Sequence, residues 1–338
     1  MAPNLKNLCH NLCVRLKSEA MNNTGWIRRA VVSLGAAVAV AAASVVLAWA
    51  IPADAPVPEP VSPVAAAEGT CPATVVVAAR GSEQNRPEDV PPTRHSPRLQ
   101  RESNGWEGTT LRYFFNLVEY RNPGSFDDAY VLGLEPGYYP AKFPMPEVVP
   151  DGHAIVPFEL IRRIAEILHL TPPSVIAGNA VNEFVDSLQR AIPGVPRAIA
   201  DYEAQTGCQP HYLLVGYSQG AVALAAAEKA IDEQTGGRVA GVLTIGAPPK
   251  PAGLIPYELR ALLQEYPMDA VTERRLDYCR SGDVICESTW KNAVDALASG
   301  GIGVHADYFK SAALDPGQAS TSEAAVADQF AGWLRPQG

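Results

Sequence analysis

The chain has 338 residues, enough for one large domain or two small ones with a substantial core. Acidic residues outnumber basic ones by 36 to 27, and the sequence has no basic patch interleaved with aromatic residues. This composition argues against nucleic acid as a partner, because binding to phosphates needs clustered positive charge.

An apolar segment without charges spans residues 30–51 and directly follows Arg28 and Arg29. A basic flank before an apolar core is typical of an export signal or of a single membrane anchor. The length favours an anchor, whereas the high alanine content and two small-x-small motifs favour a cleaved signal, which is the reading we prefer. Under either reading the chain after residue 55 leaves the cytoplasm.

The expected domain organisation follows from this segment. Residues 1–55 form the signal peptide or signal anchor, and Met21 is an alternative start to Met1. Residues 56–68 are rich in proline and alanine and form a linker, and residues 69–338 form one globular domain. We expect a secreted or extracytoplasmic protein, held at a membrane or cell envelope through residues 30–51 if that segment stays uncleaved.

Four of the six cysteines follow the apolar segment, namely Cys71, Cys208, Cys279 and Cys286. An even number of cysteines in an oxidising compartment indicates disulfides. Zinc is the alternative, but their spacing contains no C-x-x-C pair, so we expect no metal.

The first half of the globular part predicts two strands and a long irregular stretch. Residues 74–79 are β-branched and apolar, as in a strand buried on both faces. Residues 84–108 are polar and punctuated by prolines, which indicates a surface excursion. Residues 111–120 fit a helix or a strand, and residues 130–139 are expected to hold the second strand and its exit.

Helices dominate the middle of the chain. An amphipathic helix is predicted over residues 158–170, and another over residues 179–191. Residues 195–205 look like a continuation of the second helix beyond a break at Pro193 and Pro196.

The second half alternates strands with helices. Strands are predicted at residues 212–215, 239–245 and 275–278, and helices at residues 219–234 and 322–334. Residues 290–298 form a separate segment before the glycine-rich residues 300–303, with no element assigned to it. This alternation predicts a parallel sheet covered by helices on both sides.

The motif G-x-S-x-G lies between the strand at 212–215 and the helix at 219–234. A strand that turns sharply into a helix puts its central residue into strained backbone angles, and only small residues fit two positions away, here Gly216 and Gly220. The turn exposes the hydroxyl of Ser218 and aims the helix N-terminus at whatever the serine attacks. We interpret Ser218 as a nucleophile.

A serine nucleophile needs a base that takes its proton. When the order along the chain is serine, acid, histidine, His305 is the base, because it is the only histidine after Ser218. A surface histidine is the alternative reading.

The acid that orients the base lies between the serine and the histidine. Asp283 stands out because a disulfide between Cys279 and Cys286 would close a short loop around it and fix its carboxylate. Asp277 reads instead as a strand-edge residue. Asp307 lies too close along the chain to face the histidine.

These residues resemble the cutinase family of serine esterases, of the actinobacterial cutinase-like type. The motifs that carry the resemblance are residues 216–221, the 279–286 loop with Gly282-Asp283, His305-x-x-Tyr308, and residues 80–83, 139–141 and 174–178. The positions of Cys71 and Cys208 before two strands also match the family.

The resemblance implies an α/β-hydrolase (cutinase-like) three-layer sandwich with a central, mainly parallel sheet. It implies Ser218 as nucleophile, His305 as base and then acid, and Asp283 as the orienting residue. The oxyanion hole would come from Ser82 and the backbone N–H of Gln219, and the disulfides would be Cys71–Cys208 and Cys279–Cys286. No metal or organic cofactor is implied, and we expect a monomer.

The chain is longer than compact cutinases, and the surplus falls near residues 84–130 and 142–173. These insertions either pack over the active site or decorate a distant surface.

The expected activity is the hydrolysis of acyl or lipid esters through an acyl-enzyme. An acyltransferase with the same triad is an alternative, and so is a non-catalytic cell-surface binding protein on a hydrolase scaffold.

Overall fold

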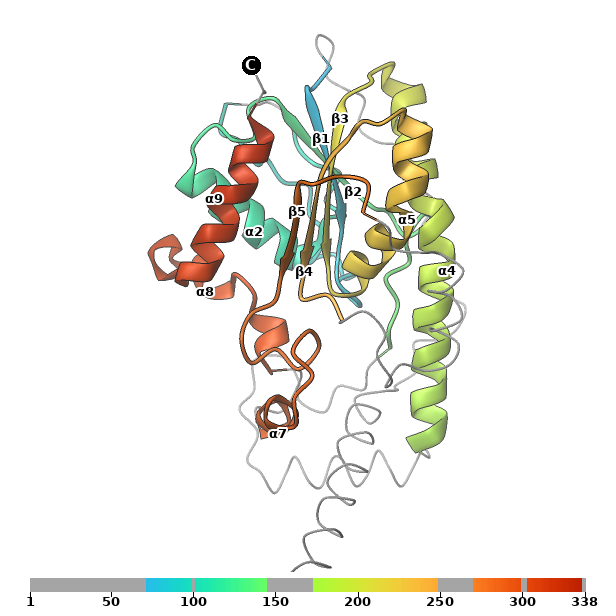
Figure 1. Ribbon diagram of the computed structural model, residues 1–338, viewed down its shortest axis with the longest axis vertical. Helices are drawn as coiled ribbons and strands as arrows, with labels where there is room; N and C mark the ends of the chain where they lie inside the picture. Colours follow the sequence, from blue (N-terminus) through green and yellow to red (C-terminus); the bar gives the residue numbers. More distant parts are fainter. Residues whose placement is uncertain (1–70, 99–100, 145–172, 249–269, 299–302, 336–338) are drawn as a thin grey trace, which may run out of the picture.

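The structure is a computed structural model, and we describe residues 71–98, 101–144, 173–248, 270–298 and 303–335 (Figure 1). The expected export segment, the linker, the helix at 158–170 and most of the insertion at 142–173 lie outside these residues. Within the described part of the chain, none of the helices is long and apolar enough to cross a membrane.

A five-stranded parallel sheet forms the centre of the described domain, in the strand order β2-β1-β3-β4-β5. The strands are β1 (Thr74–Ala79), β2 (Ala129–Gly133), β3 (His211–Tyr217), β4 (Val239–Ile245) and β5 (Arg275–Tyr278). Each overlaps a region where the sequence predicts a strand, although β2 ends at Gly133 and β3 extends from His211 to Tyr217. Because the strands are parallel, their carboxyl ends share one edge of the sheet, where a site can assemble.

Helices cover both faces of the sheet (Figure 1). One face carries α2 (Gly108–Arg121), the short α8 (Lys310–Leu314) and α9 (Thr321–Leu334), and the other carries α4 (Pro173–Thr206) and α5 (Gln219–Thr235). The remaining elements are α7 (Trp290–Ala298) and the 3₁₀ turns η1 (Gly303–Asp307) and η2 (Pro316–Gln318). This three-layer α/β arrangement, with a parallel sheet between two layers of helices, agrees with the predicted fold class.

The core divides into two halves, one on each side of the sheet. Along β1, Val75, Val77 and Ala79 pack under α4 and α5, whereas Val76 and Ala78 pack under α2 and α9. Both sets are fully buried, as a central parallel strand requires, because helices lie on both of its faces.

Residues 111–120, which fitted either a helix or a strand, lie in helix α2. Leu111, Phe114, Phe115 and Val118 are all buried, and their spacing of three, four and seven residues places them on one helical face. A strand of the same residues would divide these side chains between two faces.

The break predicted at Pro193 and Pro196 is wrong, because α4 continues through both prolines. A proline inside a helix costs about 3 kcal/mol. Burial of one large aliphatic side chain contributes about 1.5–3 kcal/mol, and Ile192, Val195 and Ile199 of this stretch are buried in the core. Packing against the sheet therefore offsets the loss of backbone hydrogen bonds.

Both disulfides that the family resemblance implies are present. Cys71–Cys208 joins the residues that precede β1 and β3, and Cys279–Cys286 closes the loop after β5. The first bond spans 137 positions, and in the chain-entropy treatment such a loop stabilises the fold by about 5 kcal/mol.

Candidate active site

Ser218 occupies the sharp turn between β3 and α5, with φ 54° and ψ −119°. The turn is possible because two neighbouring positions lack a side chain. A Cβ atom on Gly216 would lie 2.5 Å from Ala221 Cα, and one on Gly220 would lie 2.1 Å from the carbonyl oxygen of Ala79. Glycine is therefore required at both positions, and the strained serine sits at the carboxyl edge of the sheet.

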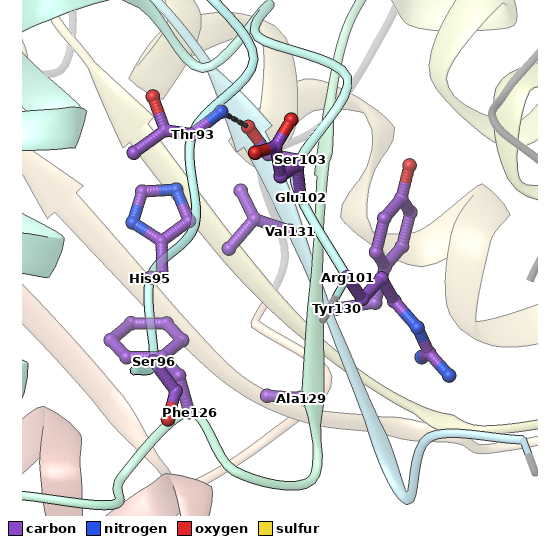
Figure 2. Close-up of a pocket in the computed structure, with 10 residues that line it drawn as sticks. All are labelled: Thr93, His95, Ser96, Arg101, Glu102, Ser103, Phe126, Ala129, Tyr130 and Val131. Carbon is purple, nitrogen blue, oxygen red and sulfur yellow. Dashed lines mark hydrogen bonds between the residues drawn. The ribbon is translucent and has the colours of Figure 1, made fainter. Parts of the chain in front are cut away.

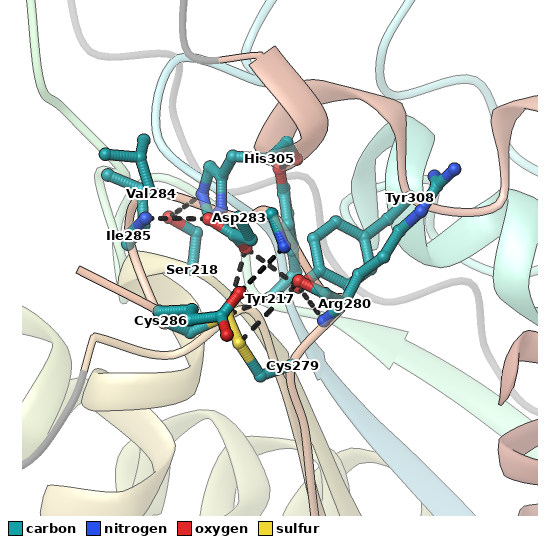
Figure 3. A network of polar contacts seen from close by, with 12 residues as sticks. Tyr217, Ser218, Cys279, Arg280, Asp283, Val284, Ile285, Cys286, His305 and Tyr308 are labelled. Atoms are coloured by element: carbon teal, nitrogen blue, oxygen red, sulfur yellow. Dashed lines mark hydrogen bonds and ion pairs between the residues drawn. A yellow bond between two sulfur atoms is a disulfide. The ribbon is translucent and has the colours of Figure 1, made fainter. Parts of the chain in front are cut away.

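The three catalytic candidates lie in one hydrogen-bonded line (Figure 3). His305 Nε2 lies 2.9 Å from Ser218 Oγ, and His305 Nδ1 lies 2.8 Å from Asp283 Oδ2. The histidine comes from η1, and the aspartate from the loop after β5, 22 positions earlier. Both side chains are almost completely buried.

Asp283 has further partners on both carboxylate oxygens. Oδ2 also accepts a hydrogen bond from the Tyr308 hydroxyl at 2.7 Å, and Oδ1 accepts one from the Ile285 backbone N–H at 2.7 Å. Burial raises the pKa of Asp283, but the hydrogen bonds and the nearby His305 outweigh it and hold the pKa below the ordinary value. An ionised Asp283 keeps the proton of neutral His305 on Nδ1, which leaves Nε2 to accept from Ser218.

Two residues for which the sequence predicted no role lie against the His305 ring. Tyr217 stacks on the ring with centroids 5.1 Å apart and donates a hydrogen bond to the His305 backbone carbonyl. Gly246, at the end of β4, has φ 58°, and a Cβ there would lie 3.0 Å from His305 Cε1. In the sequence, Tyr217 could have been found as the tyrosine beside the nucleophile, and Gly246 as the glycine directly after a buried strand.

The disulfide loop positions Asp283 closely. Cys286 Sγ, which has no proton in the disulfide, lies 3.1 Å from Asp283 Oδ2. Cys279, Asp283 and Cys286 have metal-ligand side chains within 4.8 Å of one another. Their sulfurs are bonded to each other, so they are not free thiolates that could bind zinc.

The two oxyanion-hole candidates meet where β1 ends and α5 begins. Gln219 is the first residue of α5, so its backbone N–H has no acceptor within the helix. Ser82 follows β1, and its Oγ lies 3.3 Å from the side-chain Oε1 of Gln219. Gln219 directly follows Ser218 in the chain, and this hydrogen bond brings Ser82 to the side chain of Gln219.

Arg80 belongs to the motif at residues 80–83, but the sequence predicted no role for its side chain, which stabilises this loop. Its fully buried guanidinium donates to the carbonyls of Leu134 and Tyr139 and to Asn85 Oδ1, and it lies 4.9 Å from the Trp106 ring. Burial lowers the pKa of Arg80 to about 10, which leaves it charged at neutral pH. A buried cation bonded to carbonyls holds the chain after β1 against the turn after β2.

Glu83 follows Ser82 in the same loop and has φ 61°. Its backbone N–H donates to the Ala141 carbonyl at 2.8 Å, and its carboxylate accepts from the Phe143 N–H. Burial raises the pKa of Glu83.

A small pocket lies elsewhere in the domain, and Figure 2 shows its lining. His95 Nε2 lies 3.1 Å from Glu107 Oε1, which also accepts from Ser103 Oγ at 2.7 Å. The pocket has room for about one water molecule. It lies beside the amino end of β2, whereas Ser218 follows the carboxyl end of β3, so it is separate from the candidate active site.

Comparisons with known proteins agree with the sequence motifs. The cutinase family model matches residues 177–316, which include Ser218, Asp283 and His305 but not Ser82. A solved structure of a Trichoderma reesei cutinase in complex with a phosphonate inhibitor is 16% identical and covers 78% of this chain and 75% of its own, with a TM-score of 0.35, too low to bear on function.

A search of curated proteins gives no match. The family match contains the G-x-S-x-G turn and the disulfide loop, and the fold around it is a parallel sheet between two helical layers. Over residues 177–316, this chain is similar to the cutinase family.

Proposed function

We propose that the protein is an exported serine esterase that hydrolyses acyl or lipid esters through a Ser218–His305–Asp283 triad. The observation that carries the proposal is the continuous hydrogen-bonded line from Ser218 Oγ through His305 to Asp283. A structural role alone would not require a strained serine aimed at a buried histidine.

In the first half of the reaction, Ser218 Oγ attacks the ester carbonyl carbon while His305 Nε2 takes the hydroxyl proton. The tetrahedral oxyanion is held by the Gln219 backbone N–H and by Ser82. As the carbon–oxygen bond to the alcohol breaks, His305 returns the proton to the leaving oxygen and an acyl-enzyme remains. Each oxyanion donor contributes about 3–4 kcal/mol to transition-state stabilisation.

In the second half, water attacks the acyl-enzyme and gives its proton to His305. The acid product leaves as the proton returns to Ser218 Oγ. Asp283 stays ionised throughout, because its pKa lies below the ordinary value, and its charge stabilises the imidazolium that forms in both halves.

An extracellular location is supported by the two disulfides and by the family. The basic flank and apolar segment before residue 55 supply the export signal in this proposal. The substrate class is an ester with a short to medium acyl chain or an envelope lipid ester, and the enzyme acts as a monomer without a cofactor.

The test measures hydrolysis of p-nitrophenyl esters from acetate to palmitate by the purified protein. Ser218→Ala should abolish both hydrolysis and covalent labelling by an alkyl phosphonate, while Ser311→Ala, an exposed serine in α8, should retain both. Stoichiometric labelling of Ser218→Ala would refute the nucleophile. Labelling without hydrolysis would point to transfer of the acyl group to another acceptor.

A further inference from the structure

The side chain of Gln219 has four hydrogen-bonding partners. Its Oε1 accepts from the hydroxyl of Ser82 at 3.3 Å, and the hydroxyl of Tyr139 lies 3.2 Å from the same oxygen. Its Nε2 donates to the carbonyls of Lys142 at 3.2 Å and Phe184 at 3.4 Å. Two donors on one side and two acceptors on the other allow only one orientation of the amide.

Tyr139 belongs to the turn after β2 and is completely buried. Its hydroxyl lies within donating distance of two acceptors, the Arg80 carbonyl at 3.0 Å and Gln219 Oε1 at 3.2 Å. Burial raises the pKa of Tyr139, so the phenol keeps its proton at any pH at which the enzyme works. A single phenol therefore connects the loop after β1 with the start of α5.

Ser82 has one hydroxyl proton, and in this structure it is directed to Gln219 Oε1. To donate to an oxyanion, that proton must leave the amide oxygen. Gln219 is 0% exposed, so an Oε1 atom without a donor would carry an uncompensated desolvation penalty. The second donor, Tyr139, removes that penalty, because it is already within reach of the same oxygen.

We propose that Tyr139 is a positioning residue of the oxyanion hole. Its hydroxyl satisfies Gln219 Oε1 when Ser82 turns its proton from the amide to the developing oxyanion. No covalent bond changes in this step, and the two hydroxyls only redistribute their hydrogen bonds. The inference rests on the proposed esterase function and adds a residue that does not touch the substrate.

Tyr139→Phe tests the proposal, because it removes one oxygen and keeps the ring. We expect kcat for a p-nitrophenyl ester to fall about tenfold, less than the 10²–10³-fold typical of a lost direct donor, with KM changed less than twofold. Affinity for an alkyl boronic acid, which forms a tetrahedral anion on the serine, should fall by the same factor as kcat. Tyr130→Phe is the matched control, since the buried Tyr130 hydroxyl has no hydrogen-bond partner among the described residues.

The role through Ser82 is tested by a double-mutant cycle. In Ser82→Ala there is no hydroxyl proton for Tyr139 to free from Gln219 Oε1. The double variant Tyr139→Phe, Ser82→Ala should therefore have the same kcat as Ser82→Ala alone. A merely structural Tyr139 would reduce kcat by the same factor in both backgrounds. Such additivity, or an unchanged kcat in folded Tyr139→Phe, would overturn the inference while leaving the esterase function intact.

A second variant keeps the test open if Tyr139→Phe does not fold. Gln219→Glu introduces a carboxylate that holds the Ser82 proton more strongly once it ionises, so kcat should fall as pH rises. Part of this fall comes from repulsion of the oxyanion, and the Ser82→Ala background isolates that part. We expect a smaller pH-dependent loss in that background, and an equal loss would overturn the inference. Absence of Ser218-dependent hydrolysis in the wild type would overturn the proposed function and the inference with it.

Discussion

A substitution at Tyr308 would show how much its hydroxyl stabilises the ionised carboxylate of Asp283 in the proposed triad. Its hydroxyl donates to Asp283 Oδ2 at 2.7 Å and accepts from the Arg280 backbone N–H at 2.8 Å, and the residue is 1% exposed. Tyr308→Phe removes this oxygen and leaves the His305–Asp283 hydrogen bond in place. The substitution therefore separates the support of the carboxylate from its contact with the base.

The expected loss of stability follows from the two bonds. A hydrogen bond to an ionised group contributes about 1.5–3 kcal/mol, and a neutral backbone bond about 1 kcal/mol. We expect Tyr308→Phe to lower the free energy of unfolding by about 2–4 kcal/mol. For a domain of this size the melting temperature should fall by about 5–10 °C. The kcat should fall less than tenfold, because the base keeps its partner.

The loss should also depend on pH. Tyr308 helps to hold the pKa of Asp283 below the ordinary value of 3.8, and the variant raises that pKa. A lowered pKa stabilises the folded state above 3.8, and this stabilisation is lost as pH falls through the folded-state pKa. The deficit of Tyr308→Phe should therefore be largest at neutral pH and shrink below a pH of about 4.

The assay is urea unfolding of wild type and Tyr308→Phe between pH 3 and pH 7. Tyr278→Phe is the control. Among the described residues its hydroxyl makes a hydrogen bond with Ser322 Oγ at 3.0 Å and with no carboxylate, so its deficit should not vary in the same way. An equal deficit of Tyr308→Phe at both ends of the pH range would refute the electrostatic reasoning. A loss of kcat as large as that of Asp283→Asn would refute the separation of roles.

Three further substitutions follow from the geometry. Gly220→Ala places a Cβ 2.1 Å from the carbonyl oxygen of Ala79 and should lower kcat at least about 100-fold. Gly332→Ala is the control: a Cβ at that position would have no neighbouring atom within 4 Å, so kcat and melting temperature should not change. Asp283→Asn should lower kcat about 10⁴-fold at neutral pH while the circular dichroism spectrum stays unchanged; a loss below tenfold would remove Asp283 from the triad. The pKa of Glu83 is raised, so the free energy of unfolding of the wild type should fall as pH rises through that pKa. Glu83→Gln should lack this fall, because glutamine does not ionise. Curves of the free energy of unfolding against pH that run parallel for the two proteins would contradict this.

Much of the sheet could be predicted because its strands are short apolar runs with clear boundaries. β1, β4 and β5 begin and end where the residue pattern places them. The continuous α4 could not be predicted, since local preference at Pro193 argues for a break and only packing on the sheet offsets it.

The candidate site shows the same division. Ser218, Asp283 and His305 could be singled out because a motif, a short cysteine loop and a single downstream histidine mark them. The hydrogen bonds of Tyr139 could not, because they form only when the turn after β2 meets the end of β1 and the start of α5. The role of a buried hydroxyl depends on neighbours that are distant in the sequence.

The Cys71–Cys208 bond also determines how the enzyme can be attached to a solid support. It fixes the point where the described domain begins to the amino ends of β1 and β3, while Ser218 lies beyond the carboxyl end of β3. Figure 1 places the end of α9 at the opposite end of the domain from α7, which follows the Asp283 loop. Immobilisation through either end of the domain would therefore leave the edge of the sheet that carries Ser218 facing the solution. A force applied at the amino-terminal side would act on the Cys71–Cys208 disulfide, which is a covalent bond.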